Sequence, residues 1–198
     1  MCAPSVGSSG DTNMSIAVKA ALDRTLRRYV DHCQRITGAL PTQEYDREWP
    51  SECQIGEPDA DGMIHWRPRQ RNAAADFSGL ESALEIDIHP DIKSFYGSYW
   101  GAAIAMQAAE GGVTLIQVWN DADFDRLVEN ILGHAMAKQR VKAPLTVFIA
   151  CTDENESMLS VDNDTGRVVL EEPGSPPSRE VSPSLVEFLD RLQPIAGP

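Results

Sequence analysis

The stretch Ala102-Ala-Ile-Ala-Met-Gln-Ala-Ala-Glu-Gly-Gly-Val-Thr-Leu-Ile-Gln-Val-Trp119 decides the fold class of this chain. It contains two extended runs, residues 102–108 and 113–119, on either side of Glu110-Gly111-Gly112. Two short apolar runs joined by a glycine-containing turn are typical of a β-hairpin. The sequence therefore predicts a pair of antiparallel strands in the middle of the chain.

Further strands are predicted on the C-terminal side of this hairpin. Residues 145–152 are a nearly continuous apolar run, too short for a typical helix and rich in β-favouring residues, which indicates a buried central strand. Residues 157–162 and 167–170 flank Asn163-Asp-Thr-Gly166 and predict a second hairpin. A short strand is also expected over residues 63–69, where Pro68 ends the run.

Helices are predicted from apolar periodicity and from capping residues, over residues 14–36, 77–85, 91–100, 121–140 and 183–192. Asn120 is the expected cap of the fourth helix and Ser182 the cap of the fifth, with Pro183 in its first turn. The stretch that ends near Gly62 is rich in Pro, Glu and Asp, and we interpret it as a surface connection anchored by Trp49.

This order of elements predicts an α+β fold, in which helices flank a mainly antiparallel sheet. A chain of 198 residues fits a single domain, expected over residues 14–194. Residues 1–13 are polar, contain Pro4, Gly7 and Gly10, and are interpreted as a disordered leader that does not resemble a signal peptide. With no apolar run of the roughly 20 residues that a membrane span needs, a cytoplasmic location is expected.

The charge is strongly negative and unevenly distributed. The formal net charge is -13; residues 1–75 carry 9 basic and 10 acidic groups, whereas residues 76–198 carry 8 and 20. Such a field repels phosphate backbones and anionic lipids, so direct nucleic-acid binding is not expected. Such a field favours basic partners over acidic ones, but from composition alone the favoured explanation is that the excess carboxylates only keep the protein soluble.

No catalytic, cofactor or metal site is predicted. The four cysteines are scattered without a CxxC pair, which indicates reduced thiols that bind no metal. His134 shares a helix with Glu129 and Asn130, and a capping or core hydrogen-bond role is favoured for it over catalysis. The residues from Asp162 resemble the start of a calcium-binding loop, but Pro173 occupies the position that needs a bidentate glutamate.

The aromatic residues are mostly expected in the core, although some could line a peptide-binding groove. They are Trp66, Phe95, Tyr96, Tyr99, Trp100 and Trp119. Tyr99 and Trp100, adjacent and followed by small residues, are the pair for which partial exposure is predicted.

Four segments together resemble the Syd family of small bacterial proteins. They are Ile88-His-Pro-Asp-Ile-Lys-Ser-Phe-Tyr96, Thr114-Leu-Ile-Gln-Val-Trp-Asn-Asp-Ala-Asp-Phe124 continuing through Glu129-Asn-Ile-Leu-Gly-His134, Lys142-Ala-Pro-Leu-Thr-Val-Phe-Ile-Ala150, and Leu185-Val-Glu-Phe-Leu-Asp-Arg-Leu-Gln-Pro194. The predicted helix from Met14 corresponds to the start of the family, so that the resemblance covers nearly the whole chain.

This resemblance implies a non-enzymatic protein at the cytoplasmic face of the inner membrane. It would dock an acidic concave surface onto basic cytoplasmic loops of SecY, the channel subunit of the Sec translocon, and associate with the membrane only through that partner. The acidic positions that follow the family pattern are Glu81, Glu85, Asp123 and Glu129. The family is also similar to α+β toxin-immunity proteins, so that neutralising a basic toxin by binding stays open as an alternative.

Overall fold

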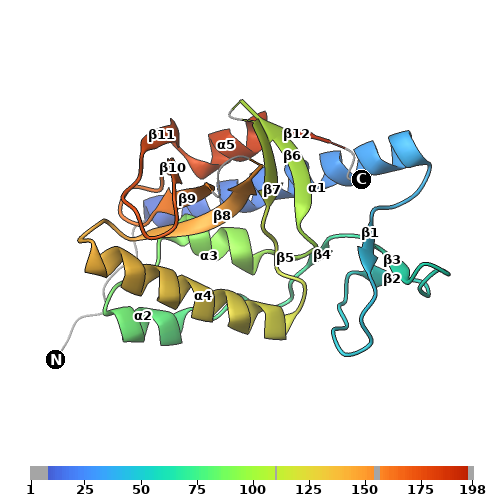
Figure 1. The fold of residues 1–198 in the computed structure, drawn as a ribbon, viewed down its shortest axis with the longest axis horizontal. Helices are drawn as coiled ribbons and strands as arrows, with labels where there is room; N and C mark the ends of the chain where they lie inside the picture. The colour runs from blue at the N-terminus through green and yellow to red at the C-terminus, as the bar shows by residue number, and fades with distance from the viewer. Residues whose placement is uncertain (1–8, 110, 154–156, 196–198) are drawn as a thin grey trace.

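An antiparallel sheet of seven strands forms the centre of the fold (Figure 1). The computed structural model describes residues 9–109, 111–153 and 157–195, and within them the strand order is β11-β10-β9-β8-β7-β6-β12. The strands are β6 Ile104–Ala108, β7 Gly111–Leu115, β8 Thr146–Thr152, β9 Met158–Asp162, β10 Val168–Glu171, β11 Arg179–Ser182 and β12 Gln193–Pro194. The α+β class and the antiparallel sheet predicted from the sequence are confirmed.

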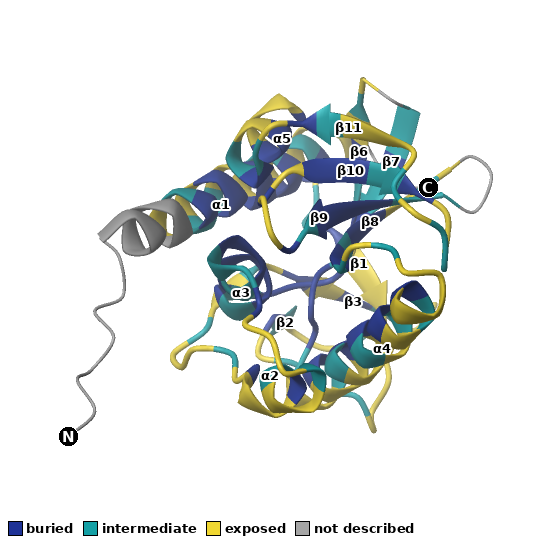
Figure 2. Ribbon diagram, turned by 90° about the vertical axis from the view of Figure 1, so that its left-hand side faces the viewer, coloured by how far each residue is buried: buried dark blue, intermediate teal, exposed yellow. Residues whose placement is uncertain are grey.

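The two predicted hairpins and the central strand are also confirmed. β6 and β7 pair antiparallel with Met106 opposite Val113, and β9 pairs with β10. β8 is the fourth of the seven strands and pairs with β7 and β9. Its residues Val147, Ile149 and Ala150 are completely buried, as Figure 2 shows for the middle of the sheet. The continuous apolar run predicted this position because a strand covered on both faces needs few polar side chains.

Five helices pack around this sheet within the part of the chain that the structure describes. They are α1 Ser9–Thr37, α2 Ser78–Leu84, α3 Pro90–Gly97, α4 Asp121–Arg140 and α5 Leu185–Arg191. α1 contacts α3 and α5, whereas α4 contacts β8 and α2. In both Figure 1 and Figure 2, α2 and α4 therefore lie together at the lower edge of the molecule, on the side away from α5.

Several predicted helix ends were wrong. α1 begins at Ser9, five residues before the predicted start, so only residues 1–8 of the expected leader lie outside the described residues. α3 ends at Gly97, because Tyr99 and Trp100 form β5, which pairs with β4 (Arg69–Gln70). Such a long-range pairing leaves no local trace in the sequence.

The cap of the last helix was assigned to the wrong serine. Ser184, not Ser182, caps α5, and its hydroxyl accepts a hydrogen bond from the backbone N–H of Glu187 at 3.2 Å. Ser182 is buried at the end of β11. Ser184 and Glu187 have the Ser-x-x-Glu spacing of a capping box, which is a better signal than the position of Pro183.

The predicted surface connection contains a small second sheet. β1 (Thr42–Glu44) and β2 (Gln54–Ile55) pair antiparallel on either side of β3 (Met63–Trp66). Trp66 is buried, and its ring meets the ring of Trp119 edge to face, with 6.2 Å between centroids. This contact fastens the small sheet to the main core. β3 falls within the strand predicted over residues 63–69, whereas β1 and β2 were missed because they are short and mostly exposed.

A buried ionic network joins α4 to the sheet. Lys138 Nζ lies 2.5 Å from Glu171 Oε2 on β10, and the side chain of each residue is at most 1% exposed. Thr146 Oγ1 donates to Glu171 Oε1 at 2.7 Å, and His134 Nε2 lies 3.0 Å from Thr146 Oγ1. Burial alone would raise the pKa of Glu171, but hydrogen bonds from His134, Lys138 and Thr146 lower it to about 2.

Replacing Glu171 with glutamine is expected to lower the free energy of unfolding at pH 7 by about 3–5 kcal/mol, because Lys138 then stays buried without a counter-ion. Equilibrium urea unfolding measures this difference. The folded-state pKa of Glu171 is depressed from 4.5 to about 2, so its contribution is complete above pH 4.5 and is lost as the pH falls towards 2. If the free energies of unfolding of the variant and the unchanged protein differed by the same amount at pH 2 and at pH 7, this prediction would be contradicted.

Candidate functional site

Of the four acidic residues predicted for partner binding, Glu81 lies on α2, Glu85 caps its end, and Asp123 and Glu129 lie on α4. The two helices are neighbours (Figure 1). Glu81 of α2 is not a free charge: it forms an ion pair with Lys93 and accepts a hydrogen bond from the N–H of Ile88 at 2.9 Å. Burial alone would raise the pKa of Glu81, but the contacts with Lys93 and Ile88 outweigh it and lower the pKa. Its carboxylate therefore holds α2 against α3.

The other three carboxylates are not paired with a cation in the described chain. Glu85 caps the end of α2 in a left-handed backbone conformation and is exposed, as is Glu129 on α4. Asp123 lies in the first turn of α4, where its Oδ2 accepts a hydrogen bond from the N–H of Trp119 at 2.8 Å. These positions leave Glu85, Asp123 and Glu129 available to an external cation.

Asp123 also lines a pocket of about 270 Å³ between the small sheet and the end of the main sheet, which we call the acidic pocket. Its walls come from β1 and the loop after it, from residues 101–103, and from the segment between β7 and α4. The lining residues are Gln43, Glu44, Asp46, Trp49, Gly101, Ala102, Ala103, Gln117, Trp119 and Asp123. Three of them are carboxylates and none is a Lys or Arg.

Two tryptophans and their hydrogen bonds hold the acidic pocket together. The indole N–H of Trp119 donates to the main-chain oxygen of Trp49 at 3.1 Å, and Ser51 Oγ donates to the main-chain oxygen of Trp119 at 2.5 Å. Asn120 Nδ2 donates to the main-chain oxygen of Pro50 at 2.8 Å. These bonds tie residues 49–51 to the start of α4 and fix the pocket walls relative to each other.

Sequence reasoning found only one acidic residue of this pocket, Asp123. Glu44 and Asp46 were missed because they lie in the segment interpreted as a surface connection. The available signal was Trp49, a large aromatic residue among polar neighbours, which contacts the core while remaining half-buried.

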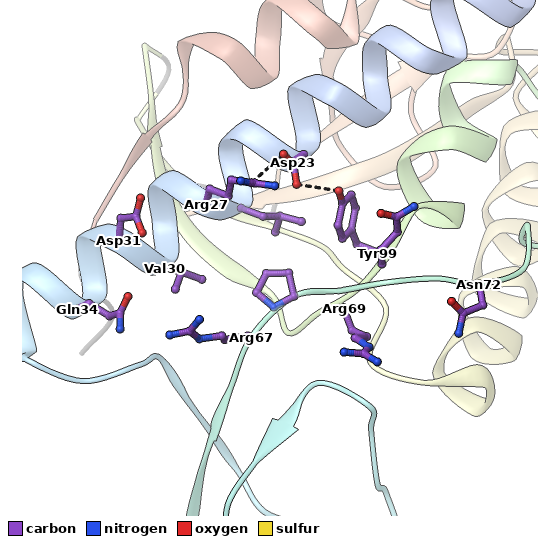
Figure 3. A pocket seen from close by; sticks show the side chains of 12 residues that line it. Asp23, Arg27, Val30, Asp31, Gln34, Arg67, Arg69, Asn72 and Tyr99 are labelled. Carbon is purple, nitrogen blue, oxygen red and sulfur yellow. Dashed lines mark hydrogen bonds and ion pairs between the residues drawn. The ribbon is translucent and has the colours of Figure 1, made fainter.

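A larger pocket, of about 700 Å³, separates α1 from the segment that contains β4 (Figure 3). Its charged residues are of both signs: Asp23, Arg27 and Asp31 on α1, and Arg67 and Arg69 opposite them. Asp23 is already neutralised, since Arg27 Nε lies 2.8 Å from its Oδ2 and Tyr99 Oη donates to its Oδ1 at 2.8 Å. Mixed charge makes this pocket a poorer site for a basic partner than the acidic pocket.

The predicted exposure of the Tyr99–Trp100 pair is confirmed for Tyr99 alone. Tyr99 is partly exposed in the larger pocket, and burial together with Asp23 raises its pKa to about 12, so its hydroxyl stays a donor. The prediction was wrong for Trp100, which is 7% exposed. The guanidinium of Arg71 covers its ring at 3.6 Å from the centroid.

His134, the histidine singled out by the sequence, lies in the buried network between α4 and the sheet. His134 contacts Thr146 and Glu171, whereas Glu129 is exposed, which confirms a core hydrogen-bond role for His134. No three His, Cys, Asp or Glu residues in the described ranges could hold a metal ion together. None of the described helices combines the length and apolarity that a bilayer crossing requires.

The fold and the pocket define the class of this protein as a single-domain α+β protein with an acidic, tryptophan-lined pocket. A family model described as "Syd protein (SUKH-2)" matches residues 19–194. The chain therefore belongs to the Syd family. The resemblance inferred from its four segments is confirmed.

Several relatives named Protein Syd align along most of the chain. The one from Pseudoalteromonas atlantica is 40% identical over 187 residues, which cover 91% of this chain and 98% of the relative. The one from Shewanella sp. strain MR-7 is 43% identical over 180 residues, 90% of this chain and 83% of the relative. The one from Colwellia psychrerythraea is 40% identical over 164 residues, 78% of this chain and 82% of the relative. These names give no support to the toxin-immunity alternative.

Asp123 is expected to stabilise the fold through its hydrogen bond with Trp119 as well as to line the pocket. Two substitutions test the contribution of the hydrogen bond. Asp123→Ala leaves the N–H of Trp119 without its acceptor and is expected to lower the free energy of unfolding by about 1–2 kcal/mol. Asp123→Asn keeps a carbonyl acceptor and should cost less than half as much. Urea unfolding of both variants tests this, and equal losses would contradict the hydrogen-bond role.

Proposed function

We propose that this chain is a non-enzymatic binding protein that docks through an acidic surface onto the basic cytoplasmic loops of SecY and thereby monitors or regulates the Sec translocon. The proposal rests on membership of the Syd family and on the excess of acidic residues after residue 75. It places the protein in the cytoplasm, held at the inner membrane through SecY.

The observation that carries the proposal is a set of five carboxylates without an ion-pair partner in the described ranges. Glu44, Asp46 and Asp123 line the acidic pocket and have no ion-pair partner in the described ranges. Glu129 lies further along α4, and Glu85 caps the end of the adjacent helix α2. We call these five carboxylates the docking surface.

The physical role of this surface is to attract and orient a basic segment. An exposed ion pair contributes only about 0–1 kcal/mol, so several carboxylates must act together. Complementary fields chiefly increase the association rate and the selectivity for a partner. The surface suits a flexible, positively charged loop because such a loop can follow carboxylates that come from several elements.

Binding of the full chain to SecYEG proteoliposomes is expected to weaken strongly between about 50 and 300 mM NaCl, because the Debye length falls to less than about 10 Å in that range. Co-sedimentation with the vesicles measures binding, and vesicles without SecYEG are the control for lipid adsorption. Binding that does not change with salt, or that equals adsorption to the control vesicles, would contradict docking by charge.

Charge reversal at two exposed positions tests whether binding depends on the docking surface or only on the net charge of the protein. Glu85→Lys/Glu129→Lys is expected to weaken binding to SecYEG vesicles about tenfold or more, mainly through a slower association rate. The matched control is Glu57→Lys/Asp61→Lys, the same change of charge on the exposed loop between β2 and β3. Equal losses in the two variants would show that only the total charge matters and that the surface is misplaced.

A further inference from the structure

The acidic pocket has the features of a site for one cationic side chain. Its volume of about 270 Å³ is below the roughly 300–1,000 Å³ of pockets that hold drug-sized molecules. Three carboxylates line it without an ion-pair partner in the described chain, and no three His, Cys, Asp or Glu residues of the described ranges are grouped closely enough to hold a metal ion. An organic cation therefore fits the pocket better than a metal ion does.

Gln117 gives an independent indication of a missing donor. It lines the pocket and is only 7% exposed. Its Nε2 donates to the main-chain oxygen of Ile116 at 2.7 Å, but its Oε1 accepts no hydrogen bond from the residues that the structure describes. This oxygen is not one of the fully buried, unpartnered side-chain atoms of the described chain, so an N–H donor from outside the protein can reach it. A ligand that brings several N–H groups would supply one.

The tryptophans favour a guanidinium over an ammonium group. Trp49 and Trp119 both line the pocket, and the guanidinium of Arg126 already lies 4.0 Å from the ring centroid of Trp49. A guanidinium stacks on an indole and presents five N–H donors in a planar fork that suits carboxylates, whereas an ammonium is a compact, strongly hydrated charge.

We infer that the acidic pocket binds the side chain of one arginine from a basic peptide segment. The guanidinium lies among Glu44, Asp46 and Asp123, one of its N–H groups donates to Gln117 Oε1, and its aliphatic stem packs on the tryptophans. This inference rests on the proposed function for the source of the segment, since it assigns one residue of the basic partner to one pocket. The neighbouring segment then extends over Glu129 and Glu85.

The test uses the full chain and a 12-residue Gly/Ser peptide with four arginines, and follows the indole N–H resonances of Trp49 and Trp119 by NMR. Saturable shifts of both resonances are expected. A peptide in which citrulline, the neutral isostere, replaces arginine is expected to cause no shift, and a lysine peptide should bind at least about threefold more weakly. Shifts with citrulline, or tighter binding of the lysine peptide, would overturn the arginine assignment.

Pocket variants provide the second arm of the test. Glu44→Gln/Asp46→Asn removes two exposed charges and is expected to weaken the arginine peptide about fivefold or more, whereas the matched control Glu57→Gln/Asp61→Asn changes affinity less than twofold. Equal effects of the two variants would overturn the site.

Gln117→Glu adds a carboxylate of nearly the same shape and is expected to tighten binding of the arginine peptide. Weaker binding of the peptide by a folded Gln117→Glu variant would count against the contact proposed for Gln117.

The same variants in the SecYEG vesicle assay separate this inference from the proposed function. Peptide binding as expected without vesicle binding would support the arginine pocket and contradict the SecY partner. The opposite outcome is vesicle binding that weakens with salt while the pocket variant binds the peptide as well as the unchanged protein does. It would support SecY as the partner and overturn the arginine pocket.

Discussion

The burial of β8 at the centre of the sheet is the constraint on which the other elements depend. Its backbone pairs with β7 and β9, and α4 packs against it. Because Val147 and Ile149 are completely buried, a shift of the strand by one residue would turn the inward-facing side chains to the other face of the sheet. The register of β8 therefore fixes that of β7, and the segment after β7 carries Gln117 and Trp119 into the acidic pocket.

Charge is used in two opposite ways in this molecule. Inside, Lys138 and Glu171 are fully paired and almost inaccessible, and their purpose is to join α4 to the sheet. Outside, the carboxylates of the docking surface are unpaired. The net charge alone could not distinguish these environments, because it does not show which carboxylates lie beside a lysine, as Glu81 and Glu171 do. Local geometry turns a surplus of charge into a candidate binding surface.

Elements with strong local signals were predictable from the sequence. The run in β8 and the cap at Asn120 identified a central strand and the start of α4, since both depend on neighbours within a few residues. The end of α3 and the strand partner β1 of the predicted β3 were not predictable, because β4–β5 and β1–β3 pair across tens of residues. The same limit applied to the candidate site: Asp123 was found on its helix, but Glu44 and Asp46 reach the pocket only through tertiary contacts.

The unpaired carboxylates of the acidic pocket also carry a cost for the isolated protein. Three like charges around a small volume repel one another, and Asp123 carries part of this repulsion while its side chain accepts the N–H of Trp119 at the start of α4. A protein selected only for stability would replace one of these residues by a neutral or basic one. Under the proposed function, their presence is a trade-off in which some thermodynamic stability is given up for recognition, and a bound cation would return it through linkage between binding and folding.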